Sequence, residues 1–537
     1  MKITARKSNI FTLSLMLGGV FMAPIASAQT IERELLGAAQ AFDAGVIDVT
    51  SGGLDSGLWQ GTSAATAAYL LKTAPYQSKN ILVQQMLETV VLSAGVPPQS
   101  ADAEQSEAYD TQRLASVMAL SQTGGRGAAL SEYIERNPKL TRAPSMRADL
   151  ALAGGDIEGA CSIADNLTEG RGEPNWARLR SFCHVERGET SAAELTAELL
   201  AGTGYQDPVF FGLMKNLTGA SNARPSVSDL SDPLLSVMSA KASAGAGIGG
   251  AATALDSEAS PSARLAAVFS AANDLRDDQI TSVFSDLAYN QEDIIASSSF
   301  DLTSAKADSG PRGTAQLFQL ANALGDPAGA AEAMSLILAK AEAAGVFSRY
   351  VALFEPSLSL IPAQTQSETN LALFTRAAIE RGNNSALRGI YNALPEGEAK
   401  SRIALIADAM ANGFTLGELG RDIEGRLEGQ GSEKRRAIRD SFIAVAMGAR
   451  LSGSAAVSLT GAGNGSGTAI QAGDLLALTA AAKVGSRAEV LLRSAAALDS
   501  ATTLNNSSLA GLISALQEAG LGQFAGRIAA EDFLKAL

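Results

Sequence analysis

The stretch SLAGLISALQEAG, residues 508–520, decides the fold class of this chain. Its apolar side chains recur at the three- and four-residue spacing of one helical face: Leu509, Leu512, Ile513 and Leu516. Gly520 follows as a stop signal, because glycine adopts the left-handed conformation that ends many helices. The stretch therefore predicts an α-helix that buries one face and needs a packing partner.

A partner helix follows, and a similar pair of helices precedes both. The following helix has three apolar positions: Phe524, Ile528 and Leu534. The first helix of the earlier pair has an apolar stripe of Leu475, Leu478 and Ala482, and Gly485 ends it. Ser486 is a candidate cap for the second helix, whose apolar positions are Val490, Leu491 and Leu498. Leu478 and Leu512 are 34 residues apart, and Gly485 and Gly520 are 35 apart. A spacing of this length is typical of one helical hairpin per repeat.

In its period and hairpin size, here and around residues 145–203, the chain resembles the TPR-like α-solenoids of exported bacterial proteins. No repeat carries a clean W-L-G-Y-A-F-A-P signature. The resemblance implies an all-α fold of stacked antiparallel hairpins with little or no sheet and a concave binding surface. It implies no activity, since such arrays serve many unrelated roles.

Composition and the remaining breaks suggest how the chain is organised. Of 537 residues, 46% are hydrophobic and 18% are charged, which is the profile of a folded protein. Two stretches rich in small residues, 243–250 (SAGAGIGG) and 451–467, are typical of linkers or long loops. The predicted organisation is a signal peptide, an N-terminal array, a central array, a linker and two C-terminal hairpins: 1–28, 29–242, 251–450, 451–472 and 473–537.

The first residues indicate export. Lys2, Arg6 and Lys7 precede an apolar stretch over 10–23, and the small residues of Ala26-Ser27-Ala28 follow. This pattern predicts a secretory signal peptide cleaved after Ala28, and thus a periplasmic protein. An uncleaved membrane anchor is the alternative, but the apolar stretch is shorter than the about 20 residues that span a bilayer. We expect no membrane insertion after cleavage.

The net charge disfavours some partners. It is −14 for the whole chain and −17 once the three signal-peptide cations are removed. Phosphate backbones and anionic lipids repel an acidic protein, so we expect neither nucleic acid nor a membrane surface as partner.

The two cysteines, Cys161 and Cys183, predict a structural disulfide. Asp156 can cap one helix and Pro174 can open the next, so the cysteines lie about ten residues either side of a turn in an antiparallel hairpin. Free thiols and redox use are the alternatives, although no C-x-x-C is present. His184, the single histidine, is expected to pack at the hairpin surface.

The sharpest charge feature is a cluster of four cations: Lys434, Arg435, Arg436 and Arg439. It is a possible contact for an anionic partner or glycan. The alternative is a solvated helix face opposite Ile438, Phe442 and Val445, neutralised by nearby glutamates.

The motifs that carry common chemistry are not found. Gly245, Gly247 and Gly250 fit G-x-G-x-x-G, but a helix precedes them where a dinucleotide site needs a strand. With one histidine, no H-E-x-x-H site is possible. Glu518 and Glu531 are expected on exposed faces, and residues 400–537 do not reproduce the Glu-Ser motif of lytic transglycosylases.

The sequence therefore favours a non-catalytic binding or scaffold protein that presents a concave helical surface to a protein or an envelope polymer. No catalytic residue, metal ligand or cofactor is predicted. A glycan-cleaving enzyme that uses carboxylates, similar to a lytic transglycosylase, is one alternative. A structural spacer is another.

Overall fold

A computed structural model describes residues 45–537, except for these positions: 79, 123–132, 134–135, 137–143, 154–155, 222–231, 245–253, 273–274, 290–300, 323–326, 359–360, 362–366, 414–422, 502 and 536–537. The predicted signal peptide, 1–28, and the glycines of 245–250 lie outside the described residues.

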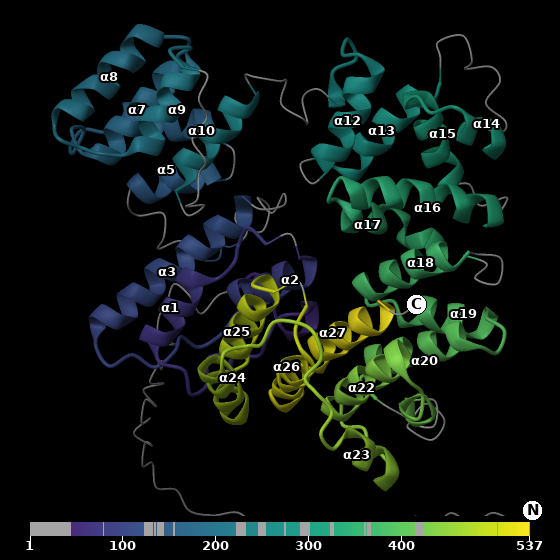
Figure 1. Cartoon of the computed structure of the whole chain (residues 1–537). Coiled ribbons are helices and arrows are strands. Elements are labelled where there is room, and N and C mark those ends of the chain that lie inside the picture. Colours follow the sequence, from purple (N-terminus) through teal and green to yellow (C-terminus); the bar gives the residue numbers. More distant parts are fainter. Residues whose placement is uncertain are drawn as a thin grey trace, which may run out of the picture. The chain divides into compact units, whose positions relative to one another are not determined.

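The described residues are helical throughout, which confirms the all-α prediction (Figure 1). They contain three isolated β-bridges and no strand. The N-terminal elements are a short 3-10 helix and three α-helices: η1 (Val49–Ser51), α1 (Ala64–Thr73), α2 (Ile81–Leu92) and α3 (Ala103–Gln122). The next six helices are α5 (Pro144–Ala153), α6 (Ile157–Asp165), α7 (Pro174–Glu186), α8 (Thr190–Gly202), α9 (Pro208–Leu217) and α10 (Pro233–Ala244).

The remaining helices continue to the C-terminal end. The central ones are α12 (Pro261–Ser270), α13 (Asp277–Ala288), α14 (Leu302–Ala307), α15 (Pro311–Ala321), α16 (Pro327–Ala343), α17 (Phe347–Leu358), α18 (Glu368–Glu380), α19 (Asn384–Ala393), α20 (Glu398–Met410), α22 (Gly431–Ala446) and α23 (Gly453–Leu459). The last four are α24 (Ala472–Val484), α25 (Arg487–Asp499), α26 (Asn506–Glu518) and α27 (Gly522–Leu534). Among the described residues, no helix is both long and apolar enough to cross a bilayer.

The C-terminal helices follow the predicted spacing. α24 begins at Ala472 and α26 at Asn506, 34 residues later. Gly485 and Gly520 follow their helices with left-handed φ values of 78° and 73°, which a side chain would strain. The predicted hairpin pair is therefore present.

Two sequence patterns typical of helix caps, at Ser486 and at Ser191 with Glu194, do not act as caps. Ser486 stands at the N-cap of α25 but makes no capping hydrogen bond, because its hydroxyl is buried against Thr62. Ser191 and Glu194, which resemble a capping box, lie inside α8, since that helix begins at Thr190. A tertiary contact therefore prevents Ser486 from capping α25. The earlier start of α8 places Ser191 and Glu194 inside the helix.

The apolar side chains form two main cores. Helices α5 to α10, which we call the disulfide module, share one core that extends from Ala148 to Ala242. The second core joins α1–α3, and Leu150 on another face of α5, to helices from α12 to α27. Trp176 lies in the first core and Trp59 in the second. The domain boundaries predicted from the sequence stay a prediction, but these cores divide the chain differently.

Helices distant in sequence also pack together, in addition to sequential hairpins such as α7–α8 and α26–α27. α2 packs against α25, and the amide of Ala488 donates to the carbonyl of Leu58 at 2.9 Å. Thr62 Oγ1 donates to Glu489 Oε2 at 2.7 Å. α27 likewise packs on α18 and α20. A strictly sequential stack therefore does not describe these contacts, and a regular repeat is not established.

Candidate functional site

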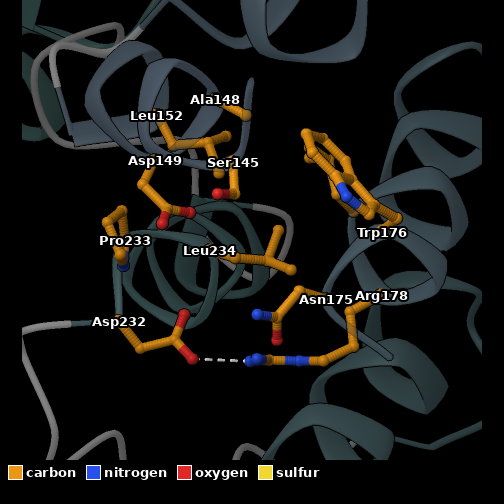
Figure 2. Close-up of a pocket in the computed structure, with 11 residues that line it drawn as sticks. Ser145, Ala148, Asp149, Leu152, Asn175, Trp176, Arg178, Asp232, Pro233 and Leu234 are labelled. Carbon is orange, nitrogen blue, oxygen red and sulfur yellow. Dashed lines mark hydrogen bonds and ion pairs between the residues drawn. The ribbon is translucent and has the colours of Figure 1, made fainter. Parts of the chain in front are cut away.

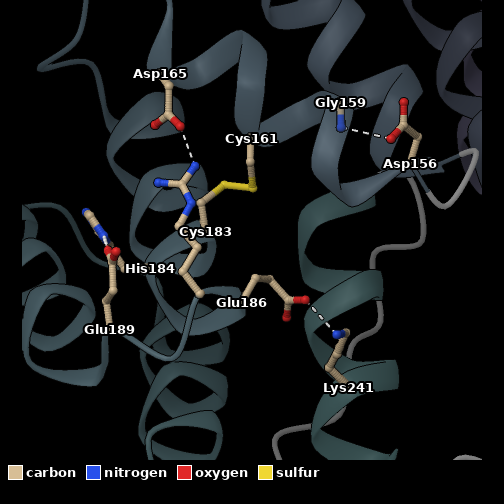
Figure 3. Close-up of a disulfide and its surroundings, with 10 residues drawn as sticks. Asp156, Gly159, Cys161, Asp165, Cys183, His184, Glu186, Glu189 and Lys241 are labelled. Atoms are coloured by element: carbon tan, nitrogen blue, oxygen red, sulfur yellow. Dashed lines mark hydrogen bonds and ion pairs between the residues drawn. A yellow bond between two sulfur atoms is a disulfide. The ribbon is translucent and has the colours of Figure 1, made fainter.

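The disulfide module contains the hairpin that the sequence predicts, formed by α6 and α7 (Figure 3). Asp156 caps α6 by accepting from the amide of Gly159 at 2.8 Å, and Pro174 occupies the first turn of α7. Cys161 and Cys183 form a disulfide with a Cα–Cα distance of 5.7 Å. The disulfide thus joins the middle of α6 to the last turn of α7.

Ion pairs join α7 to its neighbours around the disulfide. Glu186 pairs with Lys241 of α10 at 2.6 Å, and Arg187 pairs with Asp165 of α6 (Figure 3). His184 Nδ1 lies 2.6 Å from Glu189 Oε2 at the turn into α8, in the hairpin-surface position that the sequence predicts. These partly exposed pairs position α7 more than they stabilise it.

A pocket of about 190 Å³ opens between α5, α7 and α10 of this module (Figure 2). Its lining combines polar, charged and apolar side chains: Ser145, Ala148, Asp149, Leu152, Asn175, Trp176, Arg178, Leu179, Asp232, Pro233 and Leu234. Ligand sites are usually concave surfaces in which a few polar groups converge. This pocket is the candidate functional site.

Arg178 is the buried cation of the site. Its side chain is 9% exposed, and its Nη2 lies 2.7 Å from Asp232 Oδ2 and 3.6 Å from Asp207 Oδ2. Burial opposes its charge, but Asp232 outweighs burial, and the pKa of Arg178 is raised. The Arg178 Nε is buried without a hydrogen-bond partner. The guanidinium is therefore held in place while one donor stays unused.

Asp149 is the unusual group of the site. It lines the pocket, yet it has no hydrogen bond or ion pair to any described residue. Burial raises the pKa of Asp149 from 3.8 to about 6; the charge of Asp232 adds to this increase and that of Arg178 opposes it. An acid with a perturbed pKa in a pocket is a typical mark of function.

The raised pKa gives a stability prediction. The folded chain binds the Asp149 proton more tightly than the unfolded chain does, so ionisation destabilises the fold as pH rises from about 4 through 6. Asp149→Asn removes this penalty. We expect it to raise the free energy of unfolding by about 2 kcal/mol at pH 8 and to have little effect at pH 4.

Urea denaturation at both pH values measures this difference. Trp176 emission follows the module when Trp59→Phe is the common background. Glu198→Gln, an exposed charge change on α8, is the matched control and should change stability equally little at either pH. An Asp149→Asn effect that is the same at pH 4 and pH 8 would contradict the prediction.

The predicted cationic cluster does not form one surface. Lys434 and Arg435 are exposed. Arg439 instead binds Asp532 of α27 through two contacts of 2.8 Å. Arg436 lies between Asp440, at 3.1 Å, and Asp532, at 3.6 Å. Two of the four cations therefore hold α22 against α27.

Two further sequence interpretations need correction. Val445, expected on the buried face of α22, is 47% exposed, and the face that is buried instead includes Asp440 and Ile443. Glu518 is exposed as predicted, but Glu531 is not on an open face. Burial raises the pKa of Glu531 despite the nearby Arg527.

A second, larger depression of about 480 Å³ lies between α1, α24 and α25, and residues such as Tyr69, Ile470 and Leu504 line it. Its lining cation Arg493 is already paired with Glu489 at 2.8 Å, and its lining acid Asp474 is exposed. The module pocket, with the half-buried Asp149, is the stronger candidate site.

Within the described ranges, no three His, Cys, Asp or Glu side chains are grouped so that they could hold a metal ion. No protein-family model, curated protein or solved structure significantly matches this chain. The site must therefore be interpreted from its own residues.

The sequence reasoning missed the pocket. Asp207 and Asp232 precede Pro208 and Pro233 and cap α9 and α10, so their positions read as ordinary helix starts. Asp149 offers a signal, because it is the single acid in the apolar run ADLALA over 148–153.

Proposed function

We propose that this chain is a non-catalytic binding protein of the bacterial periplasm, which holds a protein or envelope-polymer partner in the pocket of the disulfide module. The observation that carries the proposal is Asp149, a half-buried acid that lines the pocket with Trp176 and Arg178 and has no hydrogen bond or ion pair to a described residue. Such a group destabilises the fold, and a bound ligand would offset that cost.

The location is part of the same proposal. A disulfide forms and persists in oxidising compartments, which supports export. The sequence of residues 1–28 supports it independently. The exported chain should begin at Gln29, and the intact mass of protein recovered from the periplasm tests this.

One observation favours a second function, a carboxylate-dependent enzyme that cleaves envelope glycan. Two acids line the pocket in different states: burial raises the pKa of Asp149, while Asp232 is paired with Arg178 at 2.7 Å. Glycosidases use such a pair, one acid as proton donor and the other as an ionised carboxylate. Because Arg178 already binds Asp232, binding without cleavage is our first proposal.

Retention on immobilised protein tests the binding function. Periplasmic extract and solubilised envelope glycan are passed over the mature wild-type chain, Asn175→Ala, Asp149→Asn and Glu198→Gln. Asn175 and Glu198 are exposed, so neither replacement should disturb folding. We expect wild type and Glu198→Gln to retain the same partner, and the two pocket variants to retain roughly tenfold less.

The other outcomes separate the alternatives. Equal retention by all four proteins would place the partner elsewhere, and no retention at any salt concentration would favour a structural spacer. Release of new reducing ends from the glycan by wild type, abolished in Asp149→Asn, would instead establish the enzyme.

A further inference from the structure

We infer that the module pocket binds a primary ammonium group on a short apolar stem, as in a lysine side chain of the partner. The inference rests on the proposed function and names the chemical group that the pocket recognises. It follows from the charges, the walls and the size of the pocket.

The charges around the pocket favour a cation. Asp149 and Asp232 line the pocket and Asp207 lies beside it, against the one guanidinium of its lining, that of Arg178. Arg178 contacts Asp207 and Asp232 but makes no ion pair with Asp149. A bound ammonium would supply the missing countercharge and reduce the repulsion between Asp149 and Asp232. A neutral sugar would leave the half-buried Asp149 without a countercharge.

The polar side chains of the pocket lie on more than one side of it, as the hydrogen bonds of an ammonium require. Figure 2 shows Ser145 and Asp149 on one side of the pocket and Asn175 across from them. None of the three has a hydrogen bond to a described residue. An ammonium donates three divergent hydrogen bonds, whereas a planar guanidinium needs acceptors in one plane. Oxygen acceptors on opposite sides therefore favour the ammonium.

The walls and the size suit the stem. Trp176, Leu152 and Leu234 supply apolar surface, and Trp176 is largely buried with only 6% of the residue exposed. The face of an indole attracts a cation by about 0.5–2 kcal/mol. The volume of about 190 Å³ is below the roughly 300–1,000 Å³ of pockets that enclose whole small molecules. It suits one side chain of a larger partner.

Arg178 provides an independent sign that the pocket is built for a ligand. Its side chain is more than nine-tenths buried, it lines the pocket, and its Nε has no hydrogen-bond partner. Buried polar groups in folded proteins are nearly always paired. The Nε–H needs an acceptor, which an ammonium cannot provide, so we assign this role to a backbone carbonyl of the peptide that carries the lysine.

Titration with model amines tests the inference on the full mature chain. In the Trp59→Phe background Trp176 is the remaining tryptophan, so its emission reports the pocket. The probes are Nα-acetyl-lysine methylamide, its Nε-acetylated form, methylguanidine and glucose. We expect saturation by the lysine probe at millimolar concentration, and affinity at least tenfold weaker for the other three.

Variants locate the binding. Asp149→Asn should weaken the lysine probe at least tenfold, while Glu198→Gln should leave its affinity within about twofold. Circular dichroism and urea denaturation establish that Asp149→Asn is folded. Equal affinity for the acetylated probe, saturation by glucose alone, or an unchanged Asp149→Asn would each overturn the inference.

The inference and the proposed function can fail separately. If partner retention depends on Asp149 but no amine binds, the ligand class is wrong and the binding site stands. If neither partner retention nor amine binding depends on Asp149, the proposed binding site and the inferred ligand class are both wrong.

Discussion

Replacing Asp440 by asparagine is expected to lower the free energy of unfolding by about 3–5 kcal/mol, because it removes the countercharge of the buried guanidinium of Arg402. The Asp440 side chain is fully buried. Its Oδ2 lies 2.6 Å from Arg402 Nη1 and 2.9 Å from Arg426 Nη1, and its Oδ1 lies 3.1 Å from Arg436 Nε. Asparagine keeps the shape of the side chain and removes only the charge.

Urea denaturation followed by Trp59 emission measures this effect, since Trp59 shares the larger core with helices α20 and α27. Glu433→Gln removes an exposed carboxylate from the same helix and should change stability by less than about 0.5 kcal/mol. Equal stability of Asp440→Asn and Glu433→Gln would contradict a structural role for the network. The transition reported by Trp176 should not move, because that residue lies in the other core.

The same network explains why the cationic cluster was only partly predictable. A run of cations in a sequence shows which of the side chains share a helix face, but it does not show which acids they pair with. Arg436 and Asp440 are four residues apart on one face of α22, so their pairing was accessible from the sequence. Asp532, which binds Arg439, is 93 residues away, and Arg402 is 38 residues before Asp440. Such contacts depend on how α20, α22 and α27 pack, which local periodicity does not specify.

The disulfide hairpin was predictable from the sequence because the features that form it are local. They are a capping Asp156, a turn, Pro174 in the first turn of α7, and one cysteine on each side of the turn. The pocket needs three helices from different parts of the module, and the sequence pattern around Asp232 indicates a helix cap before it indicates a site. Sequence patterns therefore predict the hairpins well and predict sites between hairpins poorly.

Replacing both Cys161 and Cys183 by serine is expected to destabilise the disulfide module by about 3 kcal/mol. The two cysteines are separated by 22 residues, and the cross-link restricts the unfolded chain over that loop. The separate core of the module should confine the effect. The Trp176 transition, followed in a Trp59→Phe background, should therefore move to lower urea concentration.

The Trp59 transition, followed in a Trp176→Phe background, is the internal control and should stay within about 0.5 kcal/mol. Reductant added to the protein with both cysteines should reproduce the shift at Trp176, and it should have no effect on the serine double variant. Equal movement of both transitions would mean that the two cores unfold as one. Because α7 carries Asn175, Trp176 and Arg178 as well as Cys183, loss of the disulfide should also weaken partner retention, which would link the binding site to an oxidising compartment.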